Sequence, residues 1–347
     1  MAWLTGYSYR KKITITAQSG AGTNYQVKFL IGKASGATGE NFDLGGHCLD
    51  SMMDMRFTSD NGSTQLSYWI ESVAASGTSY LATVWVKVAA DLSSSNQDIY
   101  CYYGKADATD GSNGENTFLF FDHFEGSSLD GDKWDTENTP SITVGSSTCK
   151  VLSNTLGWEG IYSKTTASAC RFRGRVTQFY DDASNSDQSA IGLMYPQFAS
   201  IATRDRGYFL HHDTAWNDTK VSLMKDNAGV TDSSEFSVGL PGIAEVLYDG
   251  SNVKANWDGT ERLGSTSWAA GDQKVGLGGY DNGGHSSYVT ADWVFLSKFV
   301  ATEPAYSSAG SEETPTNIKS INGLVKTSVK SVNGLAIASV KSFNGLT

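Results

Sequence analysis

The sequence has few prolines, few cysteines and too few basic residues to balance its acids. Five prolines stand against 37 glycines, so the chain is expected to turn on glycine and asparagine. A formal net charge of −11 argues against a sequence-independent nucleic-acid binder, because such a protein needs a positive surface. No apolar run approaches the roughly 18–20 residues of a transmembrane helix. The first residues, MAWLTGYSYRKKITI, lack a basic-then-apolar leader, so export by a signal peptide is not expected.

Several metal-binding and catalytic motifs are also missing. The four cysteines, Cys48, Cys101, Cys149 and Cys170, form no CxxC pair, which excludes a zinc ribbon. A disulfide between Cys149 and Cys170 and a pair of free, buried thiols both remain open, because sequence does not place the β-carbons. No HExxH, GxSxG or P-loop motif occurs. His211 and His212 are neighbours, and on a strand they would point to opposite faces.

Alternation of apolar and polar residues, the signature of β-strands, runs almost from end to end. In the first third it covers Arg10–Thr16, Tyr25–Ile31, Met55–Thr58, Leu66–Glu71, Leu81–Val88 and Asp98–Tyr103. A second block continues from Thr117 to Phe299 and includes a hairpin around Asp249-Gly250. No stretch shows a helical stripe. The sequence therefore predicts an all-β protein with two consecutive antiparallel β-sandwich or jelly-roll domains, residues 1–116 and 117–300.

The C-terminal part differs in composition from both blocks. Residues 301–317 contain two of the five prolines and three acids, which predicts a linker that acts as a hydrated spacer. Residues 318–347 repeat Lys-Ser-x-Asn-Gly-Leu with a period of 11 and carry four lysines and no acid. Tight turns at each Asn-Gly would make this tail a short β-meander or solenoid. An apolar pair would flank each turn: Ile321 and Leu324, Val332 and Leu335, Phe343 and Leu346.

Those apolar pairs predict a partner for the tail. Thirty residues of this composition cannot bury a core alone, so the segment is expected to act as an oligomerisation or particle anchor. Its partners would be other copies of the chain, most simply in a homotrimer, or a viral coat or tail protein. The alternative is an unstructured tail.

The N-terminal block resembles an uncharacterised β-sandwich family of microbial surface and phage proteins. Five blocks carry the resemblance across residues 1–115: Trp3 with Gly6-Tyr7 and Tyr9–Ile13, Asp54–Phe57, Tyr68–Glu71, Val84–Val88 and Ile99–Gly104. The stretches FFDHFEGSSLDGDKW (120–134) and ADWVFLSKF (291–299) resemble the first and last strands of concanavalin-like lectin and glucanase jelly rolls. The tail is similar to C-terminal repeats of phage structural proteins. Such resemblances imply a fold and no fixed activity.

Concanavalin-like glucanases place two Glu and one Asp on one strand as ExDxE or ExDxxE, so that the carboxylates share a face. This chain has neither pattern, and the closest fragment, Asp135-Thr-Glu137, is interpreted as a solvated acid pair in a turn. The sequence therefore predicts a protein without enzymatic activity. Carboxylates brought together from different strands leave a glycoside hydrolase open.

Two kinds of ligand site are expected in the second block. Sugar binding needs aromatic faces ringed by polar groups, and Trp216, Trp268, Tyr280 and His285 lie in stretches of that composition. These aromatics could instead cap a sheet edge. The concanavalin-like resemblance implies a structural Ca²⁺ between the first and last strands, where Asp122 and Asp292 fall. The alternative is that Asp122 and Asp292 are hydrogen-bonded within the protein and bind no metal.

These features favour a non-enzymatic virion component, such as a capsid decoration protein, fibre or tail adhesin, that displays a lectin-like domain for adhesion to host-surface glycans. It would be made in the host cytoplasm and attached to the virion surface by its tail. The alternative is a secreted or cell-surface protein that binds or cleaves glycans. Neither nucleic-acid binding nor membrane insertion is expected.

Overall fold

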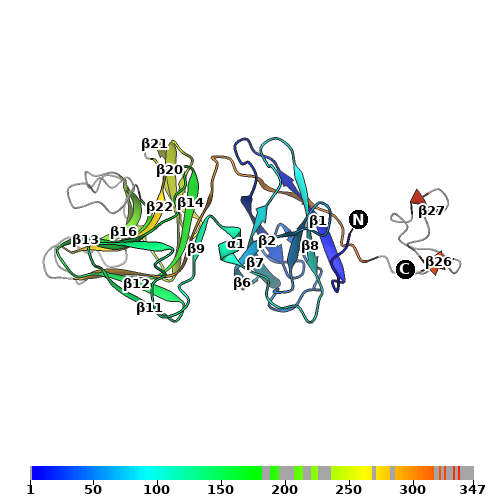
Figure 1. Ribbon diagram of the computed structural model, residues 1–347, viewed down its shortest axis with the longest axis horizontal. Coiled ribbons are helices and arrows are strands. Elements are labelled where there is room, and N and C mark those ends of the chain that lie inside the picture. The colour runs from blue at the N-terminus through cyan, green and yellow to red at the C-terminus, as the bar shows by residue number, and fades with distance from the viewer. Residues whose placement is uncertain are drawn as a thin grey trace. The chain divides into compact units, whose positions relative to one another are not determined.

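A computed structural model describes residues 2–181, 188–194, 207–213, 220–225, 236–267, 271–281 and 286–315, and four two-residue strands of the tail (Figure 1). The chain forms two compact units, and each is described separately. Unit 1 consists of Met1–Asn113 and Pro304–Thr347, and unit 2 consists of Gly114–Glu303. The only helix among the described residues is the four-residue α1 (Gly114–Thr117), which confirms the predicted all-β fold class. Within these residues, no helix is long and apolar enough to span a membrane.

Unit 1 is a sandwich of two sheets. The four-stranded sheet has the order β3-β2-β7-β6, and its strands are β2 (Tyr25–Gly32), β3 (Phe42–Asp43), β6 (Tyr68–Ser76) and β7 (Ser79–Val88). The five-stranded sheet has the order β24-β1-β8-β4-β5, and its strands are β1 (Tyr9–Thr16), β4 (Arg56–Ser59), β5 (Gln65–Leu66), β8 (Gln97–Tyr103) and β24 (Ala305–Ala309). Alternate residues of these strands are buried, for example Ile13 and Ile15 of β1. The sandwich expected for the first block is present.

Strand β24 contradicts the prediction that residues 301–317 are a linker. It pairs antiparallel with β1, with Ile13 opposite Ala309 and Thr16 opposite Ala305. The next residues continue along the same edge, since Arg10 and Glu313 exchange two backbone hydrogen bonds of 3.0 and 2.8 Å. The composition suggests a spacer because the stretch contains two prolines and three acids and no apolar periodicity. The free hydrogen-bonding edge of β1, which lies about 300 residues earlier in the chain, decides otherwise.

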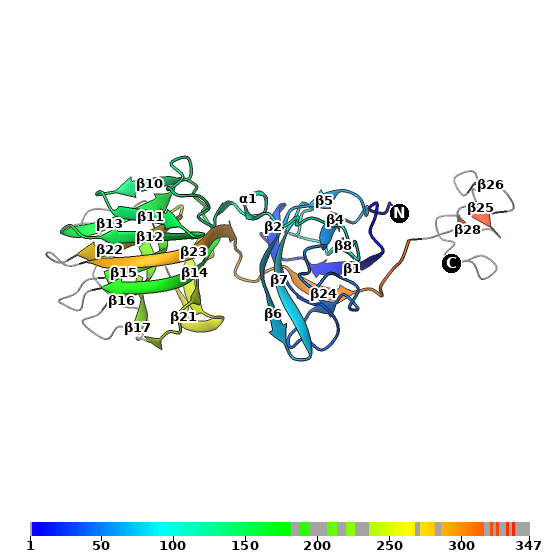
Figure 2. The same cartoon turned by 90° about the horizontal axis from the view of Figure 1, so that it is seen from below.

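Unit 2 consists of two larger sheets, and labelled strands of both are seen in Figure 2. The seven-stranded sheet has the order β10-β13-β22-β15-β16-β17-β18, and its strands are β10 (Trp134–Glu137), β13 (Gly157–Ser163), β15 (Gln188–Met194), β16 (Gly207–Asp213), β17 (Lys220–Lys225), β18 (Phe236–Ser237) and β22 (Lys274–Asp281). The eight-stranded sheet has the order β11-β12-β23-β14-β19-β20-β21, with β9 added beside β23. Its strands are β9 (Phe120–Asp122), β11 (Ser141–Gly145), β12 (Thr148–Ser153), β14 (Cys170–Asp181), β19 (Gly242–Tyr248), β20 (Asn252–Trp257), β21 (Thr260–Ser267) and β23 (Ser287–Lys298).

The apolar core of unit 2 lies between these two sheets. Every second residue of the central strands enters it, as with Ile161 of β13, Leu277 of β22 and Val246 of β19. The predicted hairpin is present: Tyr248 pairs with Val253, and the Asp249 carboxylate accepts backbone hydrogen bonds from Ser251 and Asn252 across the turn. The alternation of apolar and polar residues marks strands β10 to β13 and β21 less clearly, because most of these strands are rich in Gly, Ser and Thr.

All four cysteines are free and buried. Cys149 stands opposite Ala291 and Cys170 opposite Lys298 at different positions along β23, so the two thiols do not face each other. The sequence left a Cys149–Cys170 disulfide and free, buried thiols as alternatives, and the structure has the free thiols.

The first two tail repeats each form a two-residue ladder from the residues on the two sides of an Asn-Gly pair. Strands β25 (Ser320–Ile321) and β26 (Leu324–Val325) pair Ile321 with Leu324, and β27 (Ser331–Val332) and β28 (Leu335–Ala336) pair Val332 with Leu335. This register agrees with the predicted hairpins. Phe343 and Leu346 of the third repeat lie outside the described residues.

Candidate functional site

The outer face of the seven-stranded sheet carries a second cluster of large side chains. Residues that alternate with the core residues of β13, β15 and β22 gather there: Trp158, Tyr162, Ala190, Met194 and Tyr280. Glycines occupy further outer positions by register, with Gly160 opposite Gly278 and Gly192 opposite Gly276. Since glycine has no side chain, bare backbone separates the aromatic rings on this face.

The cluster is closed at one end and accessible at the other. Trp158 and Tyr280 are only 4% and 9% exposed and lie 5.7 Å apart between ring centroids. Tyr162, two residues along β13 from Gly160, is half-buried. Ligand access on this part of the sheet is therefore at Tyr162 and at the edge strand β10 beside it.

Strand β10 adds two carboxylates to the accessible end. Trp134 enters the core, so the alternation of the strand places Asp135 and Glu137 on the outer face. The register puts Asp135 opposite Tyr162 and Glu137 opposite Gly160. The prediction that Asp135-Thr-Glu137 lies in a turn is therefore wrong. Pairing with β13, which sequence alone does not reveal, makes it a strand whose two acids share one face.

Burial and neighbouring charges both shift pKa values within this group. Burial raises the pKa of Glu137 above its ordinary value. Burial also raises the pKa of Tyr162, and the negative charges of Asp135 and Glu137 add to that rise. Two ammonium groups complete the group, since Lys164 Nζ lies 3.6 Å from Asp135 Oδ1 and Lys274 Nζ lies 4.5 Å from the centroid of the Tyr162 ring. A phenol, two carboxylates and two ammonium groups thus converge on one part of the sheet.

The turn after β10 fixes the position of Glu137. Asn138 and Thr139 have φ angles of 61° and 78°, in the left-handed region, which a β-branched residue such as Thr139 rarely adopts. Such a conformation costs of order 1–3 kcal/mol and persists only where the surroundings enforce it. The Asn138 side chain donates a 2.8 Å hydrogen bond from Nδ2 to the Trp158 carbonyl, which ties this turn to β13. The end of β10 is therefore held against the aromatic cluster.

Only one of the predicted sugar-binding residues can be placed. Tyr280 belongs to the outer-face cluster, as a buried member. Trp216, Trp268 and His285 lie outside the described residues. Sequence inspection missed Tyr162, and it noted Asp135 and Glu137 only as a solvated acid pair because it assigned their segment to a turn instead of a strand.

The two aspartates predicted to bind Ca²⁺ have protein partners. Asp122 is buried and accepts hydrogen bonds from the Phe124 amide (2.7 Å) and from Trp134 Nε1 (2.6 Å). Asp292 lies at a bulge of β23 and pairs with Arg175. Each therefore has the hydrogen-bonded arrangement that was the alternative, and calcium binding by this pair stays a prediction. No group of three or more His, Cys, Asp or Glu side chains suited to a metal occurs among the described residues.

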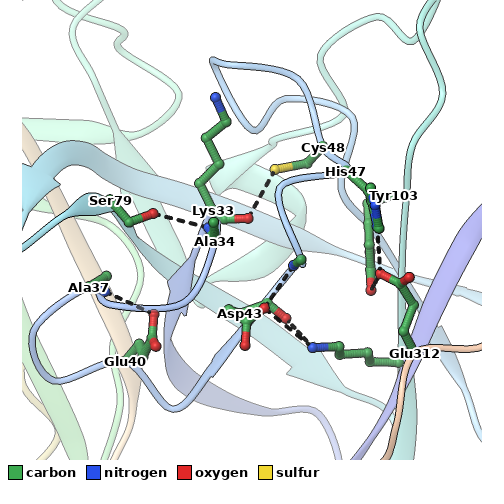
Figure 3. Close-up of polar contacts among 12 residues, drawn as sticks. Lys33, Ala34, Ala37, Glu40, Asp43, His47, Cys48, Ser79, Tyr103 and Glu312 are labelled. Carbon is green, nitrogen blue, oxygen red and sulfur yellow. Dashed lines mark hydrogen bonds and ion pairs between the residues drawn. The ribbon is translucent and has the colours of Figure 1, made fainter.

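A separate polar network in unit 1 surrounds Glu312 (Figure 3). Its carboxylate accepts a 2.9 Å hydrogen bond from the buried Tyr103 hydroxyl and lies 2.9 Å from His47 Nδ1. The His47 ring stacks on Tyr9 with 4.2 Å between centroids. Next to it, Glu313 forms a 2.8 Å ion pair with Arg10, whose side chain is 7% exposed. The acids expected to solvate a spacer instead fasten the segment after β24 to unit 1.

Comparisons with known proteins give one family match and a set of structural similarities. The family model described as "Domain of unknown function (DUF2341)" matches residues 51–137, which overlap the stretch whose motifs resemble an uncharacterised β-sandwich family. A search of curated proteins finds no match.

Among solved structures, the catalytic domain of an endo-1,3-β-glucanase (laminarinase) from Thermotoga petrophila is 10% identical, with 52% of this chain and 96% of that chain covered and a TM-score of 0.38. A GlcNAcα1-4Gal-releasing endo-β-galactosidase from Clostridium perfringens is 12% identical, with coverages of 58% and 65% and a TM-score of 0.41. The carbohydrate recognition domain of Emp47p is 13% identical, with coverages of 52% and 96% and a TM-score of 0.38. At these identities and TM-scores the similarities assign no ligand, activity or residue role to this chain.

Proposed function

We propose that unit 2 binds glycans at the accessible end of the outer face of its seven-stranded sheet. The observation that supports this most is the convergence of Asp135, Glu137, Lys164 and Lys274 around the half-buried Tyr162 ring. Pyranose rings have apolar faces and polar edges, so an aromatic ring surrounded by hydrogen-bonding groups suits them. Carboxylates accept hydrogen bonds from sugar hydroxyls, and ammonium groups donate to ring and hydroxyl oxygens.

Binding of the full chain to a panel of immobilised glycans tests this function. Tyr162→Ala is expected to weaken binding of any captured glycan at least tenfold, since it removes the ring on which the sugar would stack. Tyr180→Ala is the matched control, because Tyr180 is an exposed tyrosine of the same unit on β14, in the other sheet. Equal losses in both variants, or no glycan bound by the parent chain, would contradict the assignment.

A second candidate function is glycoside hydrolysis, favoured by the raised pKa of Glu137 and the neighbouring Asp135. A carboxyl that retains its proton can act as general acid, while an ionised one two residues away can activate water. Positions i and i+2 of a strand are about 6.6 Å apart. The stereochemical outcome depends on the separation of the two carboxyl groups themselves, roughly 6.5–9.5 Å in inverting glycosidases and ~5–5.5 Å in retaining ones.

Release of reducing sugar from bound glycans decides between binding and cleavage. Hydrolysis by this pair predicts that Glu137→Gln lowers the rate at least 100-fold while leaving binding intact. Release at the same rate by Glu137→Gln would exclude this carboxyl as the acid.

We further propose that the tail joins the protein to a larger assembly, most simply a homotrimer. The repeat of 11 residues, the four lysines and the paired backbone of Ile321 with Leu324 and Val332 with Leu335 support a docking role. A docked tail would display the glycan-binding unit on a particle or cell surface. The virion location remains a prediction.

A further inference from the structure

A buried polar group interrupts the apolar interior of unit 2 at one end of the sandwich. Glu159 of β13 and Asp281 of β22 are both 0% exposed. The register places Glu159 opposite Gly279 and Gly157 opposite Asp281, so the two acids are diagonal neighbours on adjacent strands. Both lie on the core face, since Ile161 and Leu277 of the same alternation belong to the apolar core. Two carboxylates are thus enclosed between the sheets.

Buried serines of both sheets occupy positions near these carboxylates. Ser189 of β15 pairs with Gly279 from the other side, so Glu159, Gly279 and Ser189 form one row across three strands. On the opposite sheet, Ser153 and Ser287 are paired with each other and fully buried. A β-carbon at Gly279 would lie only 2.4 Å from Ser287 Oγ and 3.1 Å from Ser153 Cβ. The absence of a side chain at Gly279 therefore leaves room for the side chains of Ser287 and Ser153.

Two side-chain oxygens of this buried group, one on Glu159 and one on Ser189, lack a hydrogen-bond partner among the described residues. Oε2 of Glu159 accepts from the backbone amides of Asn154 (2.8 Å) and Thr155 (3.1 Å). Oε1 of Glu159 and Oγ of Ser189, in contrast, have no partner within the part of the chain that the structure describes. Burial of an unpaired polar atom is costly, and burial of a carboxylate more so, so such atoms in a native core call for a partner such as a bound ion or an ordered water.

We infer that this group is a binding site for a hard divalent cation of the calcium class, with the carboxylates of Glu159 and Asp281 and the hydroxyl of Ser189 as ligands. A cation would satisfy the two unpartnered oxygens, Oε1 of Glu159 and Oγ of Ser189. Calcium accepts six to eight oxygen ligands in irregular geometry, whereas magnesium demands near-ideal octahedral geometry and retains its water. The site is distinct from the Asp122 and Asp292 pair, whose carboxylates are already bonded to other residues.

The position of this site suggests what the cation does for unit 2. Glu159 and Asp281 directly follow Trp158 and Tyr280, whose side chains form the closed end of the outer-face cluster. A cation between the sheets would therefore fix β13 and β22 beneath those aromatic rings. It would also hold the loop at Asn154 and Thr155, which is bonded to the same glutamate.

Calcium titration of the chelator-stripped full chain, by calorimetry and by thermal unfolding, tests the site. At calcium about 100-fold above its Kd, the Tm of unit 2 is expected to rise by roughly 5–10 °C, and equal magnesium is expected to have much less effect. Glu159→Gln and Asp281→Asn, which keep the side-chain shape, are each expected to weaken calcium binding at least tenfold. Asp292→Asn is the matched control and should bind as the parent chain does.

Terbium luminescence excited through tryptophan provides a readout that needs no variant, because Trp158 is adjacent to Glu159 in sequence. Calcium should displace the bound terbium. The site is overturned if the parent chain shows neither a calcium-dependent Tm nor displaceable terbium, or if magnesium stabilises it equally. It is also overturned if the calcium effect survives Glu159→Gln and disappears in Asp292→Asn. Glycan binding by the parent chain is measured separately, so failure of either proposal leaves the other standing.

Discussion

At the residue scale, Glu137 shows how one partly buried acid connects stability to the proposed site. Burial raises its pKa, so the folded protein holds the proton more tightly than the unfolded chain does. As pH rises from below the pKa of Glu137 in the unfolded chain to above its pKa in the folded protein, the buried charge increasingly destabilises the folded state. The free energy of unfolding therefore falls over this range of pH. The same property would let Glu137 donate a proton to a bound sugar.

We therefore predict that Glu137→Gln changes the pH dependence of unit 2 stability. Near pH 3 the parent chain and the variant should unfold at similar temperatures, because the parent carboxyl is protonated in both states. As pH rises from about 4 to 7, the variant should become relatively more stable, since it has no charge to bury. Calorimetry from pH 3 to 8 measures the difference, and parallel curves for the two proteins would contradict the prediction.

At the scale of elements, β24 shows how a segment distant in sequence completes a sheet. Besides its ladder with β1, its continuation places Glu313 against Arg10, whose guanidinium lies 4.2 and 4.5 Å from the ring centroids of Tyr100 and Trp3. Glu313 is partly exposed, whereas Arg10 is nearly enclosed. Removal of the acid would leave a buried, uncompensated positive charge, which is a larger penalty than the loss of an exposed pair.

Glu313→Gln is accordingly expected to lower the free energy of unfolding of unit 1 by about 3 kcal/mol. Asp98→Asn provides the matched control, because Asp98 also pairs with a residue of β1, Lys12, at 3.0 Å, but both side chains are substantially exposed. That change should cost less than about 1 kcal/mol. Denaturant unfolding followed by a probe in unit 1 compares the two, and equal effects would show that the Arg10 pair is no stronger than a surface contact.

At the scale of the whole molecule, the tail begins directly after a segment that belongs to unit 1. Glu312 and Glu313 fasten residues 304–315 to that unit, and the repeats start at residue 318. Residues 304–315 are therefore an ordered part of unit 1 rather than a free spacer. The net positive charge of the tail contrasts with the acidic remainder of the chain, which is consistent with docking on a surface of different chemistry.

Deletion of residues 318–347 should leave both units folded, with unchanged thermal transitions, while the chain becomes monomeric in solution. Deletion of residues 304–347 should in addition destabilise unit 1, because it removes β24 and both acids. Light scattering and calorimetry measure the two effects. An unchanged mass after the shorter deletion would show that the tail is not the oligomerisation element.

Sequence alone determined the features that depend on neighbours along the chain. Alternation of apolar and polar residues gave the all-β class and most strands, and Asp249-Gly250 and the repeated Asn-Gly gave the positions of hairpins. These inferences succeeded because strand period and turn chemistry are local properties. Inference from alternation is weaker at β10 to β13, where small polar residues interrupt the pattern of apolar and polar side chains. Pairing with neighbouring strands nevertheless makes these segments part of a sheet.

Only the tertiary structure decided the features that join distant residues. It paired β24 with β1, brought Asp135 and Glu137 beside Tyr162, and enclosed Glu159 and Asp281 between two sheets. None of these partners is marked by spacing, because strand order in an antiparallel sandwich brings together segments from any part of the chain. The physical reason is that a free sheet edge or a buried charge is satisfied by whichever group the fold brings near, and that group is chosen by topology.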